Sequence, residues 1–373
     1  MKADFLGIYV HIPFCVRKCA YCDFCSFPPD RFSDREKYID ALCNEILEYK
    51  ARNITIDTVF FGGGTPSLLT PLEFGKIFDA IEHSFRISPG AEITMEANPK
   101  TLTRENAAFY KSRGVNRFSL GLQSIHQNEL KLLGRIHLYS DFVELYNLLR
   151  DIGVKNINVD LMYGIPNQTQ ASFADTLATV AALKPEHISL YSLILEEGTP
   201  LYSMREHLDF PNEECDTDMY FSAVNTLSAL GYKHYEISNY AMPGKESRHN
   251  LKYWRDEEYI GVGLSAYSYF DGERYGNTSN VESYLSGASE RKISSEQIDI
   301  SSEAYEYVML ALRLADGFSL DEYKSRFGED FAESRLDTIK HLIDNGYAQI
   351  RDGNFSLTDR GMYVSNAILT ELI

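Results

Sequence analysis

Three cysteines near the start of the chain have the spacing of a metal-cluster loop. Cys15, Cys19 and Cys22 are separated by three and by two residues and follow a short apolar run. Three thiolates on one loop can bind three irons of a [4Fe–4S] cluster and leave the fourth iron with exchangeable coordination. S-adenosylmethionine (SAM) needs such an open iron, so the spacing predicts a cluster that binds SAM.

Cys25 is the fourth cysteine of this stretch and allows two other metal sites. With it the loop has the four ligands of a zinc site, although zinc ligands usually lie on two knuckles far apart in sequence. Cys19, Cys22 and Cys25 also resemble the start of a ferredoxin run, whose fourth cysteine should follow three residues later. Residues 28 and 29 are both proline, and no cysteine completes the run. We therefore expect Cys25 to be an unligated neighbour of the cluster.

Glycine and polar residues follow the next four apolar runs of the chain. Residues 62–65, Gly-Gly-Gly-Thr, come after the second run, where missing Cβ atoms let backbone groups approach a ligand closely. Glu96, Gln123 and Asp160 end the third, fourth and fifth runs. Side chains at the carboxyl ends of parallel strands point into the site face of a barrel, so we expect one shared pocket. Arg135 lies in a helical connection, and its guanidinium can clamp a carboxylate.

A repeated pattern of apolar run, polar turn and helix-period segment carries these residues from position 7 to about 195. Parallel strands need such crossovers and cover on both faces. Six repeats therefore predict an α/β fold, a partial (β/α)6 TIM-like barrel, with an open sheet as the alternative. The predicted strands span residues 7–12, 58–61, 92–96, 117–121, 156–161 and 187–191. The predicted helices include residues 34–49, 71–85, 141–152 and 170–183.

Two further segments follow the predicted barrel of residues 1–195. Residues 196–300 are rich in Tyr, Ser and Asn, and we expect a less regular extension packed on the barrel, with a turn at residues 261–263, Gly-Val-Gly. Residues 301–373 predict a small winged-helix-like α+β domain.

In that last segment, helices over residues 303–314 and 330–344 precede a hairpin with an Asp352-Gly353 turn. Winged-helix domains often bind DNA, but this segment holds 7 Lys and Arg against 13 Asp and Glu residues. The charge favours a structural or partner-docking role.

The chain is acidic, with 54 Asp and Glu residues against 36 Lys and Arg and a net charge of −18. A nucleic-acid partner needs a basic stripe to neutralise phosphates, so we expect no nucleic-acid partner. The sequence shows no transmembrane segment and no signal-peptide core, which predicts a soluble, cytoplasmic protein. Four of the six cysteines lie within eleven residues, which fits a metal site in a reducing compartment better than disulfides.

At these residues the chain resembles the radical-SAM superfamily. The cysteine loop is similar to its signature C-x3-C-x2-C-x-aromatic, ending here at Phe24, and Gly62-Gly63-Gly64-Thr65-Pro66 resembles its glycine motif. The whole chain resembles the group that contains oxygen-independent coproporphyrinogen III oxidase (HemN) and the heme chaperone HemW. This resemblance implies a SAM site formed by Tyr9, Gly63, Gly64, Thr65, Glu96, Gln123, Arg135 and Asp160.

Three features favour the HemW branch of this group. The oxidase has a fourth cysteine two residues after the third, where this chain has Phe24. The oxidase has a substantial extension before its cysteines, whereas fourteen residues precede Cys15 here. Residues 249–254, His-Asn-Leu-Lys-Tyr-Trp, match the H-N-x-x-Y-W motif that is linked to heme binding in HemW.

The physical chemistry of this motif is compatible with heme. A neutral imidazole is a good axial ligand for heme iron, which makes His249 the leading candidate. Tyr253 and Trp254 offer flat apolar surface, and in a helix Tyr253 shares a face with His249. Taken alone, a surface histidine beside two core aromatic residues explains the same pattern. The resemblance favours a heme site that includes Asn250 as well.

The sequence therefore predicts a heme chaperone that binds one heme and a SAM-liganded cluster and passes heme to an acceptor protein. An electron donor for the cluster is a further expected partner. The alternative is a radical-SAM enzyme, either a coproporphyrinogen III oxidase that decarboxylates propionates or an enzyme with another substrate. SAM cleavage stays open, so the sequence leaves open whether the protein is an enzyme.

Overall fold

Six parallel strands form the centre of a twelve-stranded sheet, as the repeated apolar runs predict. The computed structural model describes residues 5–32, 34–297 and 299–373. The six strands are neighbours in chain order, and the sheet keeps two free edges, so it curves without closing. Their bounds are β1 (Leu6–Ile12), β2 (Ile54–Gly63), β3 (Phe85–Ala97), β4 (Arg117–Gln123), β5 (Ile157–Tyr163) and β6 (His187–Ser192).

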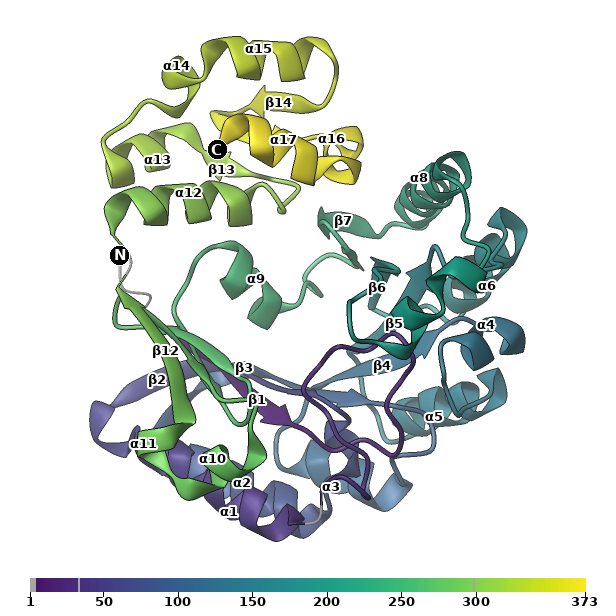
Figure 1. Cartoon of the computed structure of the whole chain (residues 1–373), viewed down its shortest axis with the longest axis vertical. Coiled ribbons are helices and arrows are strands. Elements are labelled where there is room, and N and C mark those ends of the chain that lie inside the picture. The colour runs from purple at the N-terminus through teal and green to yellow at the C-terminus, as the bar shows by residue number, and fades with distance from the viewer. Residues whose placement is uncertain (1–4, 33, 298) are drawn as a thin grey trace.

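The helices between these strands lie along the outer side of the curved sheet (Figure 1). Helix α2 shows why they form: Thr70 and Glu73 make a capping box, and Phe74, Ile77 and Phe78 are buried at helical spacing. The four predicted helices are confirmed to within two residues at each end. The bounds are α1 (Arg35–Leu47), α2 (Pro71–Ser84), α3 (Arg104–Ser112), α4 (Gln127–Leu132), α5 (Tyr139–Asp151) and α6 (Gln170–Ala182).

Residues 196–300 are more regular than expected. Helix α8 (Glu213–Ala229) starts at the cap Asn212 and buries Met219, Tyr220 and Ala223, a helical spacing that the Ser- and Asn-rich composition obscured. Strands β7 to β12 extend both edges of the sheet. The strands are β7 (Lys233–Glu236), β8 (Asn239–Ala241), β9 (Tyr259–Val262), β10 (Tyr267–Phe270), β11 (Glu273–Asn277) and β12 (Lys292–Gln297). The short helices are α7 (Pro200–Ser203), α9 (Arg248–Trp254), α10 (Val281–Ser286) and α11 (Ala288–Arg291).

The turn expected at residues 261–263 is wrong in its position. Gly261 and Val262 belong to β9, which pairs in parallel with β1. A Cβ on Gly261 would lie 2.0 Å from the carbonyl oxygen of Tyr267, so glycine serves a close backbone approach there. The chain turns only at Gly263, whose φ of +102° favours glycine.

The C-terminal residues form helices around a second, three-stranded antiparallel sheet with its own apolar core. The hairpin β14–β15 is confirmed, whereas the helix expected at 330–344 is two helices separated by Arg335, which donates a hydrogen bond to the Leu372 carbonyl at 2.8 Å. The helices are α12 (Ile300–Ala311), α13 (Leu320–Phe327), α14 (Phe331–Ser334), α15 (Leu336–Asp344), α16 (Asp359–Tyr363) and α17 (Ser365–Leu372). The strands are β13 (Phe318–Ser319), β14 (Ala348–Arg351) and β15 (Asn354–Leu357).

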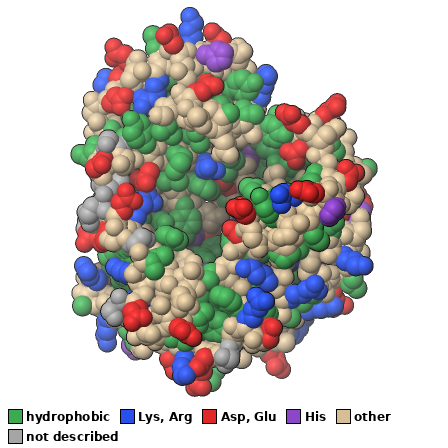
Figure 2. Space-filling model, in the orientation of Figure 1, with side chains coloured by type: hydrophobic (Ala, Val, Ile, Leu, Met, Phe, Trp, Pro, Cys, Tyr) green, Lys and Arg blue, Asp and Glu red, His purple; other side chains and the backbone are tan. Residues whose placement is uncertain are grey.

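Ion pairs and backbone hydrogen bonds tie this C-terminal part to the rest of the chain. The buried carboxylate of Asp256 pairs with Arg274 and Arg326, each at 2.9 Å. The amide of Ala315 donates to the Tyr235 carbonyl at 3.0 Å. Figure 2 shows a hollow between this part and the sheet, with hydrophobic side chains around it. Among the described residues no helix is both long and apolar enough to cross a bilayer. The division of the chain at residues 195 and 300 stays a prediction.

Candidate functional site

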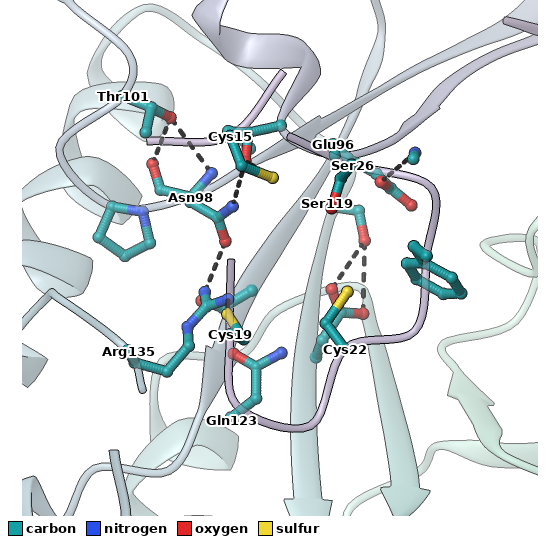
Figure 3. A pocket seen from close by; sticks show the side chains of 18 of the residues that line it. Cys15, Cys19, Cys22, Ser26, Glu96, Asn98, Thr101, Ser119, Gln123 and Arg135 are labelled. Atoms are coloured by element: carbon teal, nitrogen blue, oxygen red, sulfur yellow. Dashed lines mark hydrogen bonds between the residues drawn. The ribbon is translucent and has the colours of Figure 1, made fainter. Parts of the chain in front are cut away.

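One cavity of about 370 Å³ gathers most of the residues that the sequence singles out. Figure 3 shows Cys15, Cys19 and Cys22 beside side chains from the strand ends. The predicted residues that line the cavity are Cys15, Cys19, Cys22, Gly63, Gly64, Thr65, Glu96, Gln123, Arg135, Asp160 and Asn250. Tyr9, His249, Tyr253 and Trp254 are not among the lining residues, and neither is Cys25.

The cysteine loop is held by backbone hydrogen bonds to distant segments. The amide of Cys15 donates to the Phe27 carbonyl at 3.0 Å, and the amide of Ala20 donates to the Leu133 carbonyl at 2.9 Å. Burial raises the pKa of the Cys22 thiol to about 11. In the described part of the chain, no three His, Cys, Asp or Glu side chains converge as ligands of a single metal ion. A cubane cluster requires no such convergence, because each thiolate binds a different iron.

The glycine run at the end of β2 packs directly against β1 and the cysteine loop. A Cβ on Gly64 would lie 2.7 Å from the Phe14 carbonyl oxygen, and one on Gly63 would lie 2.5 Å from the His11 ring. The amides of Gly64 and Thr65 donate to the carbonyls of Ile12 and Phe14 at 2.8 and 2.7 Å. The run therefore needs glycine for close packing, and this packing sets the position of Thr65 beside the cysteines.

A chain of hydrogen bonds joins Cys15 to Cys19 through three polar side chains (Figure 3). Thr65 donates to the Cys15 sulfur at 3.6 Å, and the Asn98 amide donates to the Thr65 oxygen at 3.0 Å. Arg135 donates to the Asn98 oxygen at 2.5 Å and to the Cys19 sulfur at 3.6 Å. Donors to sulfur stabilise negative charge there. Asn98 was not predicted from the sequence, although it follows the end of β3 by one residue.

Two carboxyl groups, Glu96 and Asp160, share the cavity. Burial and, to a smaller extent, the nearby Asp160 raise the pKa of Glu96 to about 8, against the Gly63 amide, which donates to Glu96 at 3.2 Å and lowers it. Burial also raises the pKa of Asp160, against hydrogen bonds from Asn158, Ser189 and Ser119. A cationic ligand beside these two carboxyl groups favours their charged forms and offsets the cost of their burial.

The raised pKa of Glu96 should make the stability of the ligand-free chain depend on pH. The folded state keeps the Glu96 proton up to about pH 8, whereas the unfolded state loses it at the ordinary pKa near 4.5. The free energy of unfolding should therefore fall as pH rises between these values. We expect Glu96→Gln to raise it by about 4 kcal/mol at pH 8 and to change it little at pH 4. Urea unfolding of the cluster-free chain at both pH values measures this, with the exposed Glu105→Gln as control. Equal stability of Glu96→Gln and wild type at pH 8 contradicts it.

Gln123 has an unusual backbone conformation at the end of β4. Its φ of +69° lies in the left-handed region, and the pairing of β4 with β5 shifts register between Gly121 and Gln123. Its side-chain oxygen is buried without a hydrogen-bond partner in the described structure. A strained backbone and an unpaired polar atom that face a cavity indicate a position kept for a ligand.

Tyr9 lies behind the cavity lining, on β1. His11 donates from Nε2 to the Cys25 carbonyl at 2.8 Å, so its Nδ1 accepts the Tyr9 hydroxyl at 3.1 Å. The Tyr9 ring lies 6.2 Å from the Phe60 ring, centroid to centroid. In this conformation Tyr9 supports the strand and does not reach the cavity.

The His-Asn-Leu-Lys-Tyr-Trp motif forms helix α9. His249 is 1% exposed, and both its ring nitrogens are hydrogen-bonded, Nδ1 with the Thr58 hydroxyl at 2.9 Å and Nε2 with the Tyr253 hydroxyl at 2.8 Å. Its ring stacks on Phe60 at 5.3 Å. To bind iron through Nε2, His249 would have to release Tyr253. Asn250 is the motif residue that lines the cavity.

The cavity has further polar lining residues that the sequence analysis did not name. They lie two residues apart along β4, β5 and β6, on the strand face that already carries Gln123 and Asp160. Inward positions alternate along a strand, so a period of two from the named residues would have found them. These residues are Arg117, Ser119, Asn158, His187, Ser189 and Tyr191.

The fold and the site together define a class of protein. A parallel α/β sheet with this cysteine loop after its first strand and a glycine run after its second is the arrangement that the radical-SAM resemblance implies. The family model of the radical SAM superfamily matches residues 9–180, and that of the HemN C-terminal domain matches residues 302–364. Three cysteines on one loop, two of them with side-chain donors to sulfur, the glycine run and the unpaired Gln123 oxygen fit a [4Fe–4S] cluster with SAM.

Curated relatives narrow the class to a family. The chain is 33% identical to the heme chaperone HemW of Lactococcus lactis, over 98% of this chain and 96% of that protein. It is also 33% identical to the Escherichia coli HemW, over 99% and 98% of the two chains. The chain belongs to the HemW family. The crystal structure of the E. coli coproporphyrinogen III oxidase HemN has the same fold, with a TM-score of 0.86 at 22% identity over 99% of this chain and 90% of that one.

Proposed function

We propose that this protein is a heme chaperone, which binds heme together with a SAM-liganded [4Fe–4S] cluster and passes the heme to an acceptor protein. The observation that carries the proposal is that helix α9, with the H-N-x-x-Y-W motif, and the cysteine loop contribute to one cavity through Asn250 and the three cysteines. A tetrapyrrole bound there lies within reach of the cluster.

In this proposal Cys15, Cys19 and Cys22 hold the cluster, which supplies an open iron for SAM and one-electron chemistry when bound. Glu96 and Asp160 bind the positively charged ligand by charge, since both carboxyl groups are desolvated. The residues proposed to orient SAM by hydrogen bonding and backbone contact are Gly63, Gly64, Thr65, Gln123 and Arg135. Tyr9 is proposed to act indirectly, through His11.

For heme we propose that Asn250 contacts the ligand and that His249 anchors α9 to β2. An axial role for His249 then requires a movement that breaks its contact with Tyr253. Phe24, which occupies the place of the oxidase's fourth cysteine, is 61% exposed and lines the cavity with Val16 and Ile136. These apolar side chains suit a flat macrocycle.

The proposal is tested with anaerobically reconstituted protein. We expect heme titration followed by absorbance to give one heme per chain, and the loaded protein to pass heme to a heme-free globin. In parallel, coproporphyrinogen III and SAM are supplied under reducing conditions, and no protoporphyrinogen is expected. Turnover to protoporphyrinogen would overturn the chaperone proposal in favour of an oxidase.

The Thr65 hydroxyl is expected to raise the reduction potential of the cluster. Its hydroxyl donates to the Cys15 sulfur, and donors to sulfur stabilise the reduced, more negative cluster. Thr65→Val should lower the reduction potential by tens of millivolts, on the order of one hydrogen bond. Redox titration followed by EPR measures this. Thr176→Val is the matched control, because the buried Thr176 hydroxyl has no hydrogen-bond partner among the described residues and lies on α6, away from the cavity lining. An intact cluster with an unchanged potential in Thr65→Val contradicts the expectation.

A further inference from the structure

The cavity has a second polar end, away from the cysteines. Arg117 and His187 are the first residues of β4 and β6, and Asn158 is the second residue of β5, whereas the cysteine loop lies at the opposite ends of the strands. Six residues of strand separate Arg117 from Gln123, which corresponds to about 20 Å. All three side chains are at most 3% exposed.

Most donors and acceptors at this end are used within the protein. The Asn158 amide donates to Asp160 at 2.7 Å, so its oxygen faces His187 and accepts from Nδ1 at 2.6 Å. His187 Nε2 then accepts the Tyr235 hydroxyl at 2.9 Å. This chain of hydrogen bonds holds Asp160 in place and leaves no donor of His187 for a ligand.

Arg117 is different, because part of its guanidinium is unused. Nη1 donates to the Asn156 oxygen at 3.2 Å and to the Lys245 carbonyl at 3.1 Å. In the part of the chain that the structure describes, Nε and Nη2 make no hydrogen bond, and no carboxylate oxygen lies within 4.0 Å of the guanidinium nitrogens. The side chain is 2% exposed and lines the cavity. Burial raises the pKa of the nearby Glu92 carboxyl and the Arg117 charge lowers it, but no hydrogen bond between the two is seen among the described residues. Because two guanidinium nitrogens stay unpaired in a buried site, the position is suited to an anionic ligand.

Asn250 supplies a second free donor in the same cavity. Its side-chain amide makes no hydrogen bond with any described residue. Its backbone amide donates to the hydroxyl of Ser247, the N-cap of α9. The anchor at His249 holds helix α9 against β2 and thereby sets the direction of Asn250.

We propose that Arg117 and Asn250 form a carboxylate-binding subsite at this end of the cavity. The inference rests on the proposed function, and the carboxylate it assigns is a propionate of heme. The free Nε and Nη2 of Arg117 form the fork that binds a carboxylate through two parallel hydrogen bonds. SAM, by contrast, lies at the cysteine end.

The size of the cavity agrees with a propionate arm rather than a whole macrocycle at this end. About 370 Å³ is near the lower limit of ligand pockets, which span roughly 300–1,000 Å³. SAM and a whole heme together exceed this enclosed volume, so part of the macrocycle lies outside it.

The test compares heme with heme dimethyl ester, in which both propionates are esterified, by absorbance titration of the cluster-loaded protein. We expect Arg117→Gln to weaken heme binding about 10-fold or more, as the loss of a charge-assisted hydrogen bond does. Wild type should bind the ester more weakly by a similar factor, and Arg117→Gln should bind the ester no worse than wild type does. Arg150→Gln is the matched control, because Arg150 also donates to backbone carbonyls but lies outside the cavity.

The contrary results distinguish failure of the carboxylate subsite from failure of the proposed function. Equal affinity of wild type for heme and its ester overturns the subsite and leaves the proposed function standing, and this arm needs no variant to fold. Failure of wild type to bind either ligand overturns the proposed function itself. If Arg117→Gln loses affinity for SAM while heme binding is unchanged, Arg117 serves the SAM carboxylate and the assignment to heme is wrong.

Discussion

Replacement of Cys15, Cys19 or Cys22 by alanine is expected to abolish the cluster. Each sulfur lines the cavity, and each is proposed to hold one iron, so two remaining thiolates retain the cubane poorly. Iron content of the reconstituted protein should fall from four per chain to near zero, together with the charge-transfer absorbance. SAM binding should be lost with the cluster, because the open iron is gone.

Cys25→Ala is the matched control, since Cys25 belongs to the same loop but is not a lining residue. Its thiol lies 3.9 Å from the Ser279 carbonyl oxygen. We expect this variant to keep four irons and to bind SAM as wild type does. Loss of iron in Cys25→Ala together with its retention in Cys15→Ala would show that a different set of cysteines holds the metal.

His249→Ala is expected to have the second largest effect, and mainly on stability. The substitution leaves a buried gap beside Phe60 and leaves the hydroxyls of Thr58 and Tyr253 without their partners. The free energy of unfolding should fall by about 3 kcal/mol, from the cavity and the unpaired polar groups together. Urea unfolding measures this. Heme affinity should fall as well, because α9 no longer holds Asn250 in place.

His249→Gln separates anchoring from iron ligation. A glutamine amide can keep one of the two hydrogen bonds, so the loss of stability should be about 1 kcal/mol. The Soret band of bound heme should match that of wild type if His249 only anchors the helix. A folded His249→Gln variant with a shifted Soret band and weakened heme binding would identify His249 as the axial ligand.

The six parallel strands and their helices were predictable because they depend on short-range pattern. Apolar runs such as residues 156–161 alternate with helix-period segments, and that periodicity reflects burial on a sheet covered by helices. Helix α8 was missed for a local reason: its buried residues, such as Met219 and Ala223, stand among Ser, Thr and Asn. Strand β9 was missed because Gly261 reads as a turn residue until its close approach to Tyr267 is known.

The candidate site was predictable to the extent that its residues end successive strands. Parallel strands bring their carboxyl ends to one edge, so Glu96, Gln123 and Asp160 could be grouped without a structure. Arg117 was within reach of a period of two along β4, but its role, like that of Asn98, depends on contacts with residues far away in sequence, such as Lys245 and Arg135.

The sequence by itself determined the cysteine spacing, the glycine run and the order of strands, since these are properties of neighbouring residues. Only the tertiary structure decided which motif residues face the cavity. His249 and Asn250 are adjacent in sequence, yet one is enclosed between Thr58 and Tyr253 while the other lines the cavity. Successive residues of a helix point about 100° apart, and the packing of α9 against β2 sets which of them turns inward.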